Sequence, residues 1–405
     1  MQVTLVRPRK GCHGHLVRSS DRLIAFAYAF NGQRFQESLV SRSQPNTRRG
    51  QGVAADIETV ARLAGVSTAT VSRALRGLPH VSEETRARVL AAAAEVEYVA
   101  SPSASRLASG RTRSVGVVMP YIGRYYFGQV LAGAEAVMRG SGYDVLLFAL
   151  PDDAARRDFF ARMPLRRRVD AVLIITLPLS GDQVSRFRGL GVPMATVGMP
   201  MPGASAVGID DAAAARTATS HLINLGHERI AMIGGGLSDA EPNLFATPGQ
   251  RASGYRAALA AAGLVWRAEY EVDGRYTSLG AEQAMGQLMS LPRPPTAVFA
   301  QSDSMAIGAM HALRITGLGC PDDVSIVGFD DHEVAEPLEL TTIAQPMPEQ
   351  GAAAAKQLLS ALAGGEAEDV VLPTHLVLRA TTSTPPSRRH VNRREADETR
   401  AGQPE

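Results

Sequence analysis

The chain has 405 residues, enough for two or three domains, and its 45% hydrophobic and 20% charged residues are ordinary for a globular protein. The net charge is only +2, so any affinity for nucleic acid must come from a local basic face. Cys12 and Cys320, the two cysteines, match no metal-ligand spacing, so we expect no metal and a reducing, cytoplasmic setting. No cofactor is expected either. No apolar run approaches the ~18–20 residues of a membrane helix, so no membrane partner is expected.

Residues 1–53 are basic and irregular, and two interpretations of them stay open. One is a disordered basic extension, since arginines greatly outnumber acids there. The other is a mis-assigned start, with translation beginning near Val53, because no methionine lies between Met1 and Met119. An intact-mass measurement on native protein separates the two.

Residues 56–75, DIETVARLAGVSTATVSRAL, predict two short helices joined by a tight turn at Gly65. Asp56 is placed to cap the first helix, and Ser67 to cap the second. The outer side of the second helix carries hydroxyls and an arginine but no carboxylate: Thr68, Ala69, Ser72 and Arg73. Such a helix suits a DNA major groove, although an ordinary pair of packed helices would show the same spacing.

A third helix is predicted after Ser82, with Val89, Leu90, Ala93 and Val96 on its apolar face. Residues 54–100 therefore predict a small helical domain with a helix-turn-helix. Residues 101–113, SPSASRLASGRTR, are small and polar and predict a linker.

From Ser114 onward the sequence alternates between apolar strands and alanine-rich helices. Strands are expected at 115–120, 143–150, 169–175, 193–198, 229–235, 296–303 and 324–331. This alternation predicts parallel sheets covered on both faces, and the length suits two α/β lobes with a ligand cleft between them. Residues 384–405 are rich in Pro, Arg and Glu and predict a disordered tail.

Two groups of segments resemble one known family. AGVSTATVSRAL and VSEETRARVLAAAAEVEY resemble the DNA-binding headpiece of the lactose-repressor/galactose-repressor family of bacterial transcription regulators. HLINLGHERIAMIGG, AVFAQSDSMAIGAMHAL and PDDVSIVGFDD resemble the sensor of the same family. The resemblance implies an all-α helix-turn-helix headpiece plus an α/β two-lobed periplasmic-binding-protein-like sensor domain at 114–383. Lobe one is expected at about 114–208 and 342–370, and lobe two at about 209–341 and 371–383.

The resemblance also implies roles in DNA binding. Arg73 is expected to read a base, while Thr68 and Ala69 occupy positions that vary within the family. Three hydroxyl residues are expected to hold phosphates: Ser67, Thr70 and Ser72.

The linker, at 101–113, resembles a hinge that becomes helical on DNA and wedges a leucine into the minor groove. Leu107 is the expected wedge. The five steps from Pro102 to Leu107 are about two fewer than is usual in the family, which puts the register of the hinge in doubt. A plain flexible linker stays open.

In the sensor, the resemblance implies ligand contacts for Arg251, Tyr276 and Asp330. Each has a structural alternative. Arg251 could form an ion pair on a helix surface, Tyr276 could belong to the core, and Asp330 could cap the next element. Asp303 also matches a family acid at a strand end, where a capping role is equally expected.

The first loop of the sensor departs from the family pattern. It reads YIGRYYF at 121–127, so Tyr126 and Phe127 are expected to be ligand contacts, and Arg124 adds a positive charge near the cleft. A sugar is the first interpretation of the effector, and a phosphorylated or carboxylated ligand stays open.

Together these patterns and the family resemblance predict a homodimeric, nucleoid-associated transcription regulator of the cytoplasm, in most cases a repressor. It is expected to bind near-palindromic double-stranded DNA under the control of a carbohydrate effector. The sensor alone would suggest a solute-binding protein without a regulatory role, and the headpiece argues against it. An enzyme is not expected, because the chain has no P-loop, no G-x-S-x-G and no H-E-x-x-H.

Overall fold

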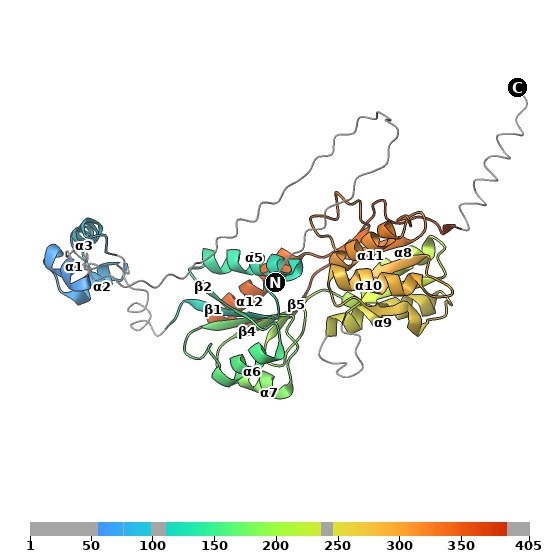
Figure 1. Ribbon diagram of the computed structural model, residues 1–405. Coiled ribbons are helices and arrows are strands. Elements are labelled where there is room, and N and C mark those ends of the chain that lie inside the picture. The colour runs from blue at the N-terminus through green and yellow to red at the C-terminus, as the bar shows by residue number, and fades with distance from the viewer. Residues whose placement is uncertain (1–55, 76, 99–110, 236–245, 387–405) are drawn as a thin grey trace, which may run out of the picture. The chain divides into compact units, whose positions relative to one another are not determined.

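The computed structural model describes residues 56–75, 77–98, 111–235 and 246–386 (Figure 1). The chain divides after Tyr98 into two units, a small helical headpiece and a larger two-lobed domain. The helical and α/β architectures expected from the sequence are both confirmed. Parts of three predictions lie outside the described residues: the extension at 1–53, the hinge residues 101–110 with the wedge Leu107, and residues 387–405 of the tail predicted at 384–405.

The headpiece consists of three helices: α1 (Ile57–Ala64), α2 (Thr68–Leu75) and α3 (Glu83–Glu95). Each begins at a predicted cap. The Asp56 carboxylate accepts a hydrogen bond from the amide of Thr59 at 2.8 Å, and the Ser67 hydroxyl accepts one from the amide of Thr70 at 3.2 Å. Gly65 ends α1 with a φ of 65°, a conformation that glycine adopts without steric cost.

One valine from each helix forms the centre of the headpiece core: Val60, Val71 and Val89 are all fully buried. Arg86 of α3 adds a polar connection to α2. Its Nη1 donates to the carbonyl oxygen of Ala74 at 2.8 Å, and its Nη2 donates to that of Leu78 at 3.1 Å. The end of α2 is thus held by a side chain from another helix, which supplies partners for carbonyls that a helix terminus leaves open.

We expect Arg86→Ala to loosen the last turn of α2. Two charge-assisted hydrogen bonds at a half-buried position correspond to about 1–2 kcal/mol, so amide exchange in α2 should accelerate about 5- to 30-fold. Hydrogen exchange of the full chain measures this. Arg88→Ala, which removes an exposed arginine of the same helix, is the control. Equal protection of α2 in both variants would contradict the role given to Arg86.

Lobe one contains a parallel six-stranded sheet in the order β11-β5-β4-β3-β1-β2. Its strands are β1 (Ser114–Met119), β2 (Asp144–Ala149), β3 (Ala171–Ile175), β4 (Met194–Val197), β5 (Ser205–Gly208) and β11 (Val370–Val371). Helices α5 (Tyr125–Gly140) and α12 (Met347–Leu362) cover one face, and α6 (Asp153–Arg162) and α7 (Gly181–Arg188) cover the other (Figure 1).

Helices α5 and α12 pack very closely against each other. A Cβ atom on Gly133 would lie 1.9 Å from the carbonyl oxygen of Pro348, and one on Gly351 would lie 1.9 Å from that of Val130. Only glycine fits at these two contacts.

Lobe two contains the second six-stranded sheet, in the order β12-β10-β9-β8-β6-β7, with β12 antiparallel to β10. Its strands are β6 (Ile230–Gly234), β7 (Glu271–Asp273), β8 (Ala297–Ala300), β9 (Ser325–Asp330), β10 (Thr342–Ala344) and β12 (His375–Val377). One face packs against α8 (Asp211–Asn224) and α9 (Ala246–Ala261). The other packs against α10 (Ser278–Met289) and α11 (Asp303–Ile315), and the 3-10 helix η1 (Ala268–Tyr270) precedes β7.

The chain passes between the lobes three times, and the second passage differs from the sequence-based boundary. The boundary was expected before Thr342, but β10 pairs in parallel with β9 of lobe two. The Thr342 hydroxyl also donates to Asp303 of that lobe at 2.6 Å. The passage to α12 therefore follows Ala344.

The start of lobe one corrects the end of the predicted hinge. The Asp170 carboxylate accepts hydrogen bonds from the amide of Thr112 at 2.7 Å, from its hydroxyl at 2.9 Å and from the amide of Arg113 at 2.8 Å. Arg113 has a φ of 51°, which these contacts stabilise. Thr112 and Arg113 thus belong to the folded lobe, whereas the sequence assigned them to the hinge.

Candidate functional site

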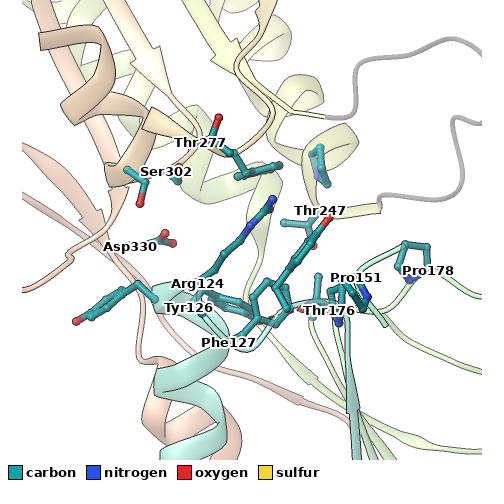
Figure 2. Close-up of a pocket in the computed structure, with 18 of the residues that line it drawn as sticks. Arg124, Tyr126, Phe127, Pro151, Thr176, Pro178, Thr247, Thr277, Ser302 and Asp330 are labelled. Carbon is teal, nitrogen blue, oxygen red and sulfur yellow. Dashed lines mark hydrogen bonds between the residues drawn. The ribbon is translucent and has the colours of Figure 1, made fainter. Parts of the chain in front are cut away.

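A cleft of about 540 Å³ lies between the two lobes at the carboxyl ends of their strands (Figure 2). In parallel α/β sheets this edge is where ligands bind. Five of the six predicted effector contacts line it: Tyr126, Phe127, Arg251, Tyr276 and Asp330. The sixth, Asp303, does not.

Arg251 and Asp211 form a buried ion pair at the lobe-two side of the cleft. Arg251 Nε donates to Asp211 Oδ1 at 2.8 Å, Nη1 donates to the carbonyl oxygen of Gln301 at 2.6 Å, and the guanidinium lies 3.6 Å from the ring centroid of Phe329. Burial raises the pKa of Asp211, and the Arg251 charge opposes that rise. Among the described residues these bonds use Nε and Nη1, which leaves Nη2 for a ligand.

Asp330 ends β9 and reaches the same cleft. Its Oδ1 accepts a hydrogen bond from Gln345 Nε2 at 2.6 Å. Burial raises the pKa of Asp330 to about 6, and the charge of Arg251 limits the rise. Its φ of 117° is unusual for a residue other than glycine, and such conformations concentrate at functional sites.

Tyr276 is held by a buried residue that sequence reasoning missed. Its hydroxyl donates to Gln301 Oε1 at 2.9 Å, while Gln301 Nε2 donates to the carbonyl oxygen of Pro248 at 3.2 Å. A Cβ on Gly235 would lie 2.3 Å from the Tyr276 ring, so the ring rests directly on glycine backbone. The GGG run at 234–236 was the available signal, since a glycine without a turn often marks close approach of another group.

Aromatic rings at the start of α5 form the lobe-one side of the cleft. The Tyr126 and Phe127 rings meet edge to face with centroids 5.3 Å apart, and the Thr176 hydroxyl donates to that of Tyr126 at 3.3 Å. Phe127 is only 8% exposed, so much of its ring belongs to the core of the lobe. Tyr125 stacks on His332 of lobe two with centroids 3.8 Å apart, which joins the two lobes beside the cleft.

Asp303 lies outside the cleft and its contacts are internal, but it is not the cap of α11, because that cap is Ser302. Its Oδ1 accepts from the Thr342 hydroxyl at 2.6 Å, and its Oδ2 accepts from the amide of His332 at 2.7 Å. The residue is fully buried. It therefore ties the start of α11 to β10 and to the loop after β9.

We expect Asp303 to make stability depend on pH. Burial raises the pKa of Asp303 to about 8 from its usual 3.8, so the folded state holds the proton more tightly than the unfolded state does. The free energy of unfolding should therefore fall as pH rises from about 4 to 8, by on the order of a few kcal/mol. Urea unfolding across this range should show a flatter profile for Asp303→Asn than for wild type or for Asp158→Asn, a surface control. Parallel profiles would contradict the shift.

The predicted DNA-contacting residues of the headpiece lie on α2 and at Ser67, the residue before it. Thr68, Ala69 and Arg73 are exposed, and Thr70 and Ser72 are partly exposed. Ser67 is exposed as well, and its hydroxyl lies 2.9 Å from that of Thr70. The side of α2 facing the core carries Val71 and Ala74. This set of residues therefore combines one flexible cation with small hydroxyl side chains.

In the part of the chain that the structure describes, no three His, Cys, Asp or Glu side chains gather in a way that could hold a metal ion. No helix there is long and apolar enough to cross a membrane. His227 is buried, and its Nδ1 lies 2.9 Å from the Thr296 hydroxyl, a structural contact.

Comparison with known proteins relates both units to one group. Residues 56–101 match the family model "Bacterial regulatory proteins, lacI family", and residues 219–382 match the "Periplasmic binding protein-like domain". The chain is 34% identical over 342 residues to the transcriptional repressor CytR of Escherichia coli, covering 83% of this chain and 98% of that one. It is 32% identical over 336 residues to the catabolite control protein A of Priestia megaterium, covering 80% and 98%.

Two solved structures of transcription regulators are also similar to this chain. The lac repressor dimer bound to operator and the anti-inducer ONPF is 27% identical, with a TM-score of 0.72 and coverage of 81% of this chain and 99% of that one. The complex of the transcriptional regulator CelR with cellobiose is 30% identical, with a TM-score of 0.61 and coverage of 81% and 100%.

Proposed function

This chain belongs to the lacI family of bacterial regulatory proteins, and from that premise we propose how it recognises its effector and its operator. It is a helix-turn-helix transcription regulator with an effector-binding domain. The headpiece distinguishes it from a plain solute-binding protein. Its relatives include repressors, and repression is the mode of action expected here.

We propose that the effector is a carbohydrate or a carbohydrate derivative bound in the cleft between the lobes. The observation that carries this is the convergence of Arg251, Asp330 and Tyr276 from three separate elements on one cavity. An ionised carboxylate accepts hydrogen bonds from hydroxyls, the guanidinium donates to ring or hydroxyl oxygens, and an aromatic ring covers an apolar sugar face. The similarity to the CelR–cellobiose complex supports the same class.

We propose that two copies of the chain bind a near-palindromic operator. A symmetric dimer presents two recognition helices to two half-sites. Similarity to a lac repressor dimer bound to operator supports this arrangement. Arg73 would read a base, and Ser67, Thr70 and Ser72 would contact phosphates. Effector and operator would influence each other's affinity by the same factor, since such coupling is reciprocal.

The test uses the full chain and labelled fragments of the chromosome around its own gene. Fluorescence anisotropy should show one fragment with inverted half-sites binding at least about 10³-fold more tightly than random DNA. A panel of mono- and disaccharides is then added to that complex, and one member should shift the binding midpoint about 5- to 150-fold. If no fragment surpasses random DNA, operator recognition is wrong; if a fragment does but no carbohydrate or derivative acts on it, the effector class is wrong.

A further inference from the structure

Arg124 is a cation of the cleft that the proposed sugar contacts do not use. It precedes α5, is partly buried and lines the cavity. Its guanidinium carbon lies 3.7 Å from the centroid of the Tyr121 ring. Figure 2 shows the side chain extending from lobe one into the middle of the cleft, in the direction of Thr277 of lobe two. The Arg124 charge also acts on Tyr276 of lobe two. Burial raises the pKa of Tyr276, and the charge of Arg124 opposes that rise.

This guanidinium has no counter-charge among the residues that the structure describes. None of their carboxylates lies within 4.0 Å of it, and none of their acceptors receives a hydrogen bond from it. The other two arginines of the cleft are engaged: Arg251 with Asp211, and Arg156 with Gln183 Oε1 at 3.0 Å.

Four acids line the cavity, Asp152, Asp153, Asp211 and Asp330, and none of them forms an ion pair with Arg124. Asp211 pairs with Arg251, and Asp153 lies in the first turn of α6. Asp152 caps α6 by accepting a hydrogen bond from the amide of Ala155 at 2.8 Å. Asp330 accepts from Gln345 and faces the charge of Arg251. Arg124 is therefore a cation on the lobe-one side of the cleft that has no carboxylate partner among the described residues, and Asp330 lies on the lobe-two side.

Such a cation is suited to an anion brought by the ligand. The guanidinium carbon lies over the Tyr121 ring, and no described residue accepts a hydrogen bond from the N–H groups. A planar guanidinium with open N–H groups matches a carboxylate or phosphate in a bidentate manner. A ligand that fills the cleft also displaces water from Arg124, and a charge that loses water without gaining a partner is destabilised. The α5 N-terminus, where the side chain of Arg124 makes no capping hydrogen bond, adds to the positive potential.

We propose that the effector carries an anionic group, a phosphate or a carboxylate, which Arg124 binds. The hydroxyl-bearing part of the same molecule lies against Asp330 and Arg251, so the anion points away from the Asp330 carboxylate. The effector is then an acidic sugar derivative and not a neutral sugar. This proposal rests on the carbohydrate cleft proposed above and specifies its ligand.

The experiment compares wild type with Arg124→Gln and with Arg139→Gln. The control removes the same charge from an exposed position of α5, the helix that Arg124 precedes, where Arg139 pairs with Glu135. Isothermal titration calorimetry of the full chain uses matched sets of probes: glucose, glucose 6-phosphate, glucuronate and gluconate, and the corresponding members of the galactose, ribose and cellobiose series. Thermal unfolding with inorganic phosphate, against chloride at equal ionic strength, accompanies it.

The tightest ligand should be a charged member of its set, bound about 10- to 100-fold more tightly than the neutral member. Arg124→Gln should remove that difference and Arg139→Gln should retain it. A preference for the phosphate or for the acids tells the two anions apart. Inorganic phosphate should stabilise wild type and the Arg139 variant but not Arg124→Gln.

Two results would overturn the proposal. If a neutral sugar binds best and Arg124→Gln leaves its affinity unchanged, the anion site is wrong, although the carbohydrate cleft stands. If no probe binds and phosphate stabilises all three proteins equally or none of them, Arg124 is not an anion site. The carbohydrate cleft itself is judged separately, by the loss of neutral-sugar binding in an Asp330 variant.

Discussion

Asp330→Asn should weaken effector binding about 10- to 100-fold while leaving the operator affinity of the unliganded protein within about twofold. Hydrogen bonds to a charged group contribute about 1.5–3 kcal/mol each, and the substitution removes the charge but keeps the shape. The fold should tolerate it. Asparagine is among the residues that accept a positive φ, here 117°, and its Oδ1 can still accept from Gln345.

Asp331→Asn is the matched control for this substitution. Asp331 is the next residue, also has a positive φ of 53°, and pairs with Arg379 at 2.8 Å instead of lining the cleft. The effector affinity of the Asp331→Asn variant should stay at the wild-type value. Calorimetric titration with the effector measures all three proteins, and equal losses in both variants would show that the loop after β9 acts through folding and not through the carboxylate.

The Asp330 carboxylate also predicts how effector binding depends on pH. The pKa of Asp330 is about 6, so the carboxylate is ionised above that pH and protonated below it. Ligand hydroxyls donate to the ionised form, and affinity should therefore fall as pH drops through about 6, approaching tenfold per unit. Asp330→Asn should lack this step. A profile that stays level between pH 5 and 7 in wild type would assign the hydroxyl contacts to another group.

The family motifs identified residues that line the cleft, but they did not identify the residues that hold those side chains in place. The resemblance to the family predicts Arg251, Tyr276 and Asp330 as ligand contacts, and all three line the cleft. Only Asp330 ends a strand, where the strand ends of a parallel sheet meet at one edge. Asp211 and Gln301 carry no such pattern. They became recognisable only when α8 and β8 placed them beside Arg251.

Asp303 shows where a strand-end acid misleads. A residue just after β8 can face the cleft or turn toward the next strand, and sequence spacing is identical in the two cases. Here a glycine decides the outcome: a Cβ on Gly328 would lie 2.1 Å from Asp303 Oδ1, so β9 leaves room for the carboxylate beneath the sheet edge. Thr342 then completes its hydrogen bonding.

Short strands and passages between lobes were the least predictable parts of the fold. β5 and β7 have four and three residues, too few for a periodic pattern. β10 is equally short, and its membership of lobe two depends on pairing with β9. The hydrogen bonds from Thr112 and Arg113 to Asp170 are likewise long-range contacts. The small, polar composition of residues 101–113 predicts a linker and gives no sign of them.

Arg73→Ala should reduce operator affinity strongly while leaving binding to random DNA nearly unchanged. Arg73 is the exposed arginine of α2, on the side opposite Val71 and Ala74. A bidentate arginine–guanine contact discriminates by about 1–3 kcal/mol, and two half-sites double that figure in a dimer. We therefore expect a loss of about 30- to 10⁴-fold on the operator.

Arg88→Ala is the control for the loss of one positive charge. If it retains operator affinity, the selective loss expected for Arg73→Ala is not an effect of net charge. Arg88 is an exposed arginine of α3, so its removal changes the net charge of the headpiece by the same amount. A phosphate contact would weaken binding to all sequences and reduce the salt dependence by about one unit of slope, whereas a base contact would relax sequence preference at one position per half-site. Competition anisotropy with operators altered base by base distinguishes the two. Equal losses on operator and random DNA would make Arg73 a phosphate contact and move base recognition to the neighbouring residues Thr68 and Ala69.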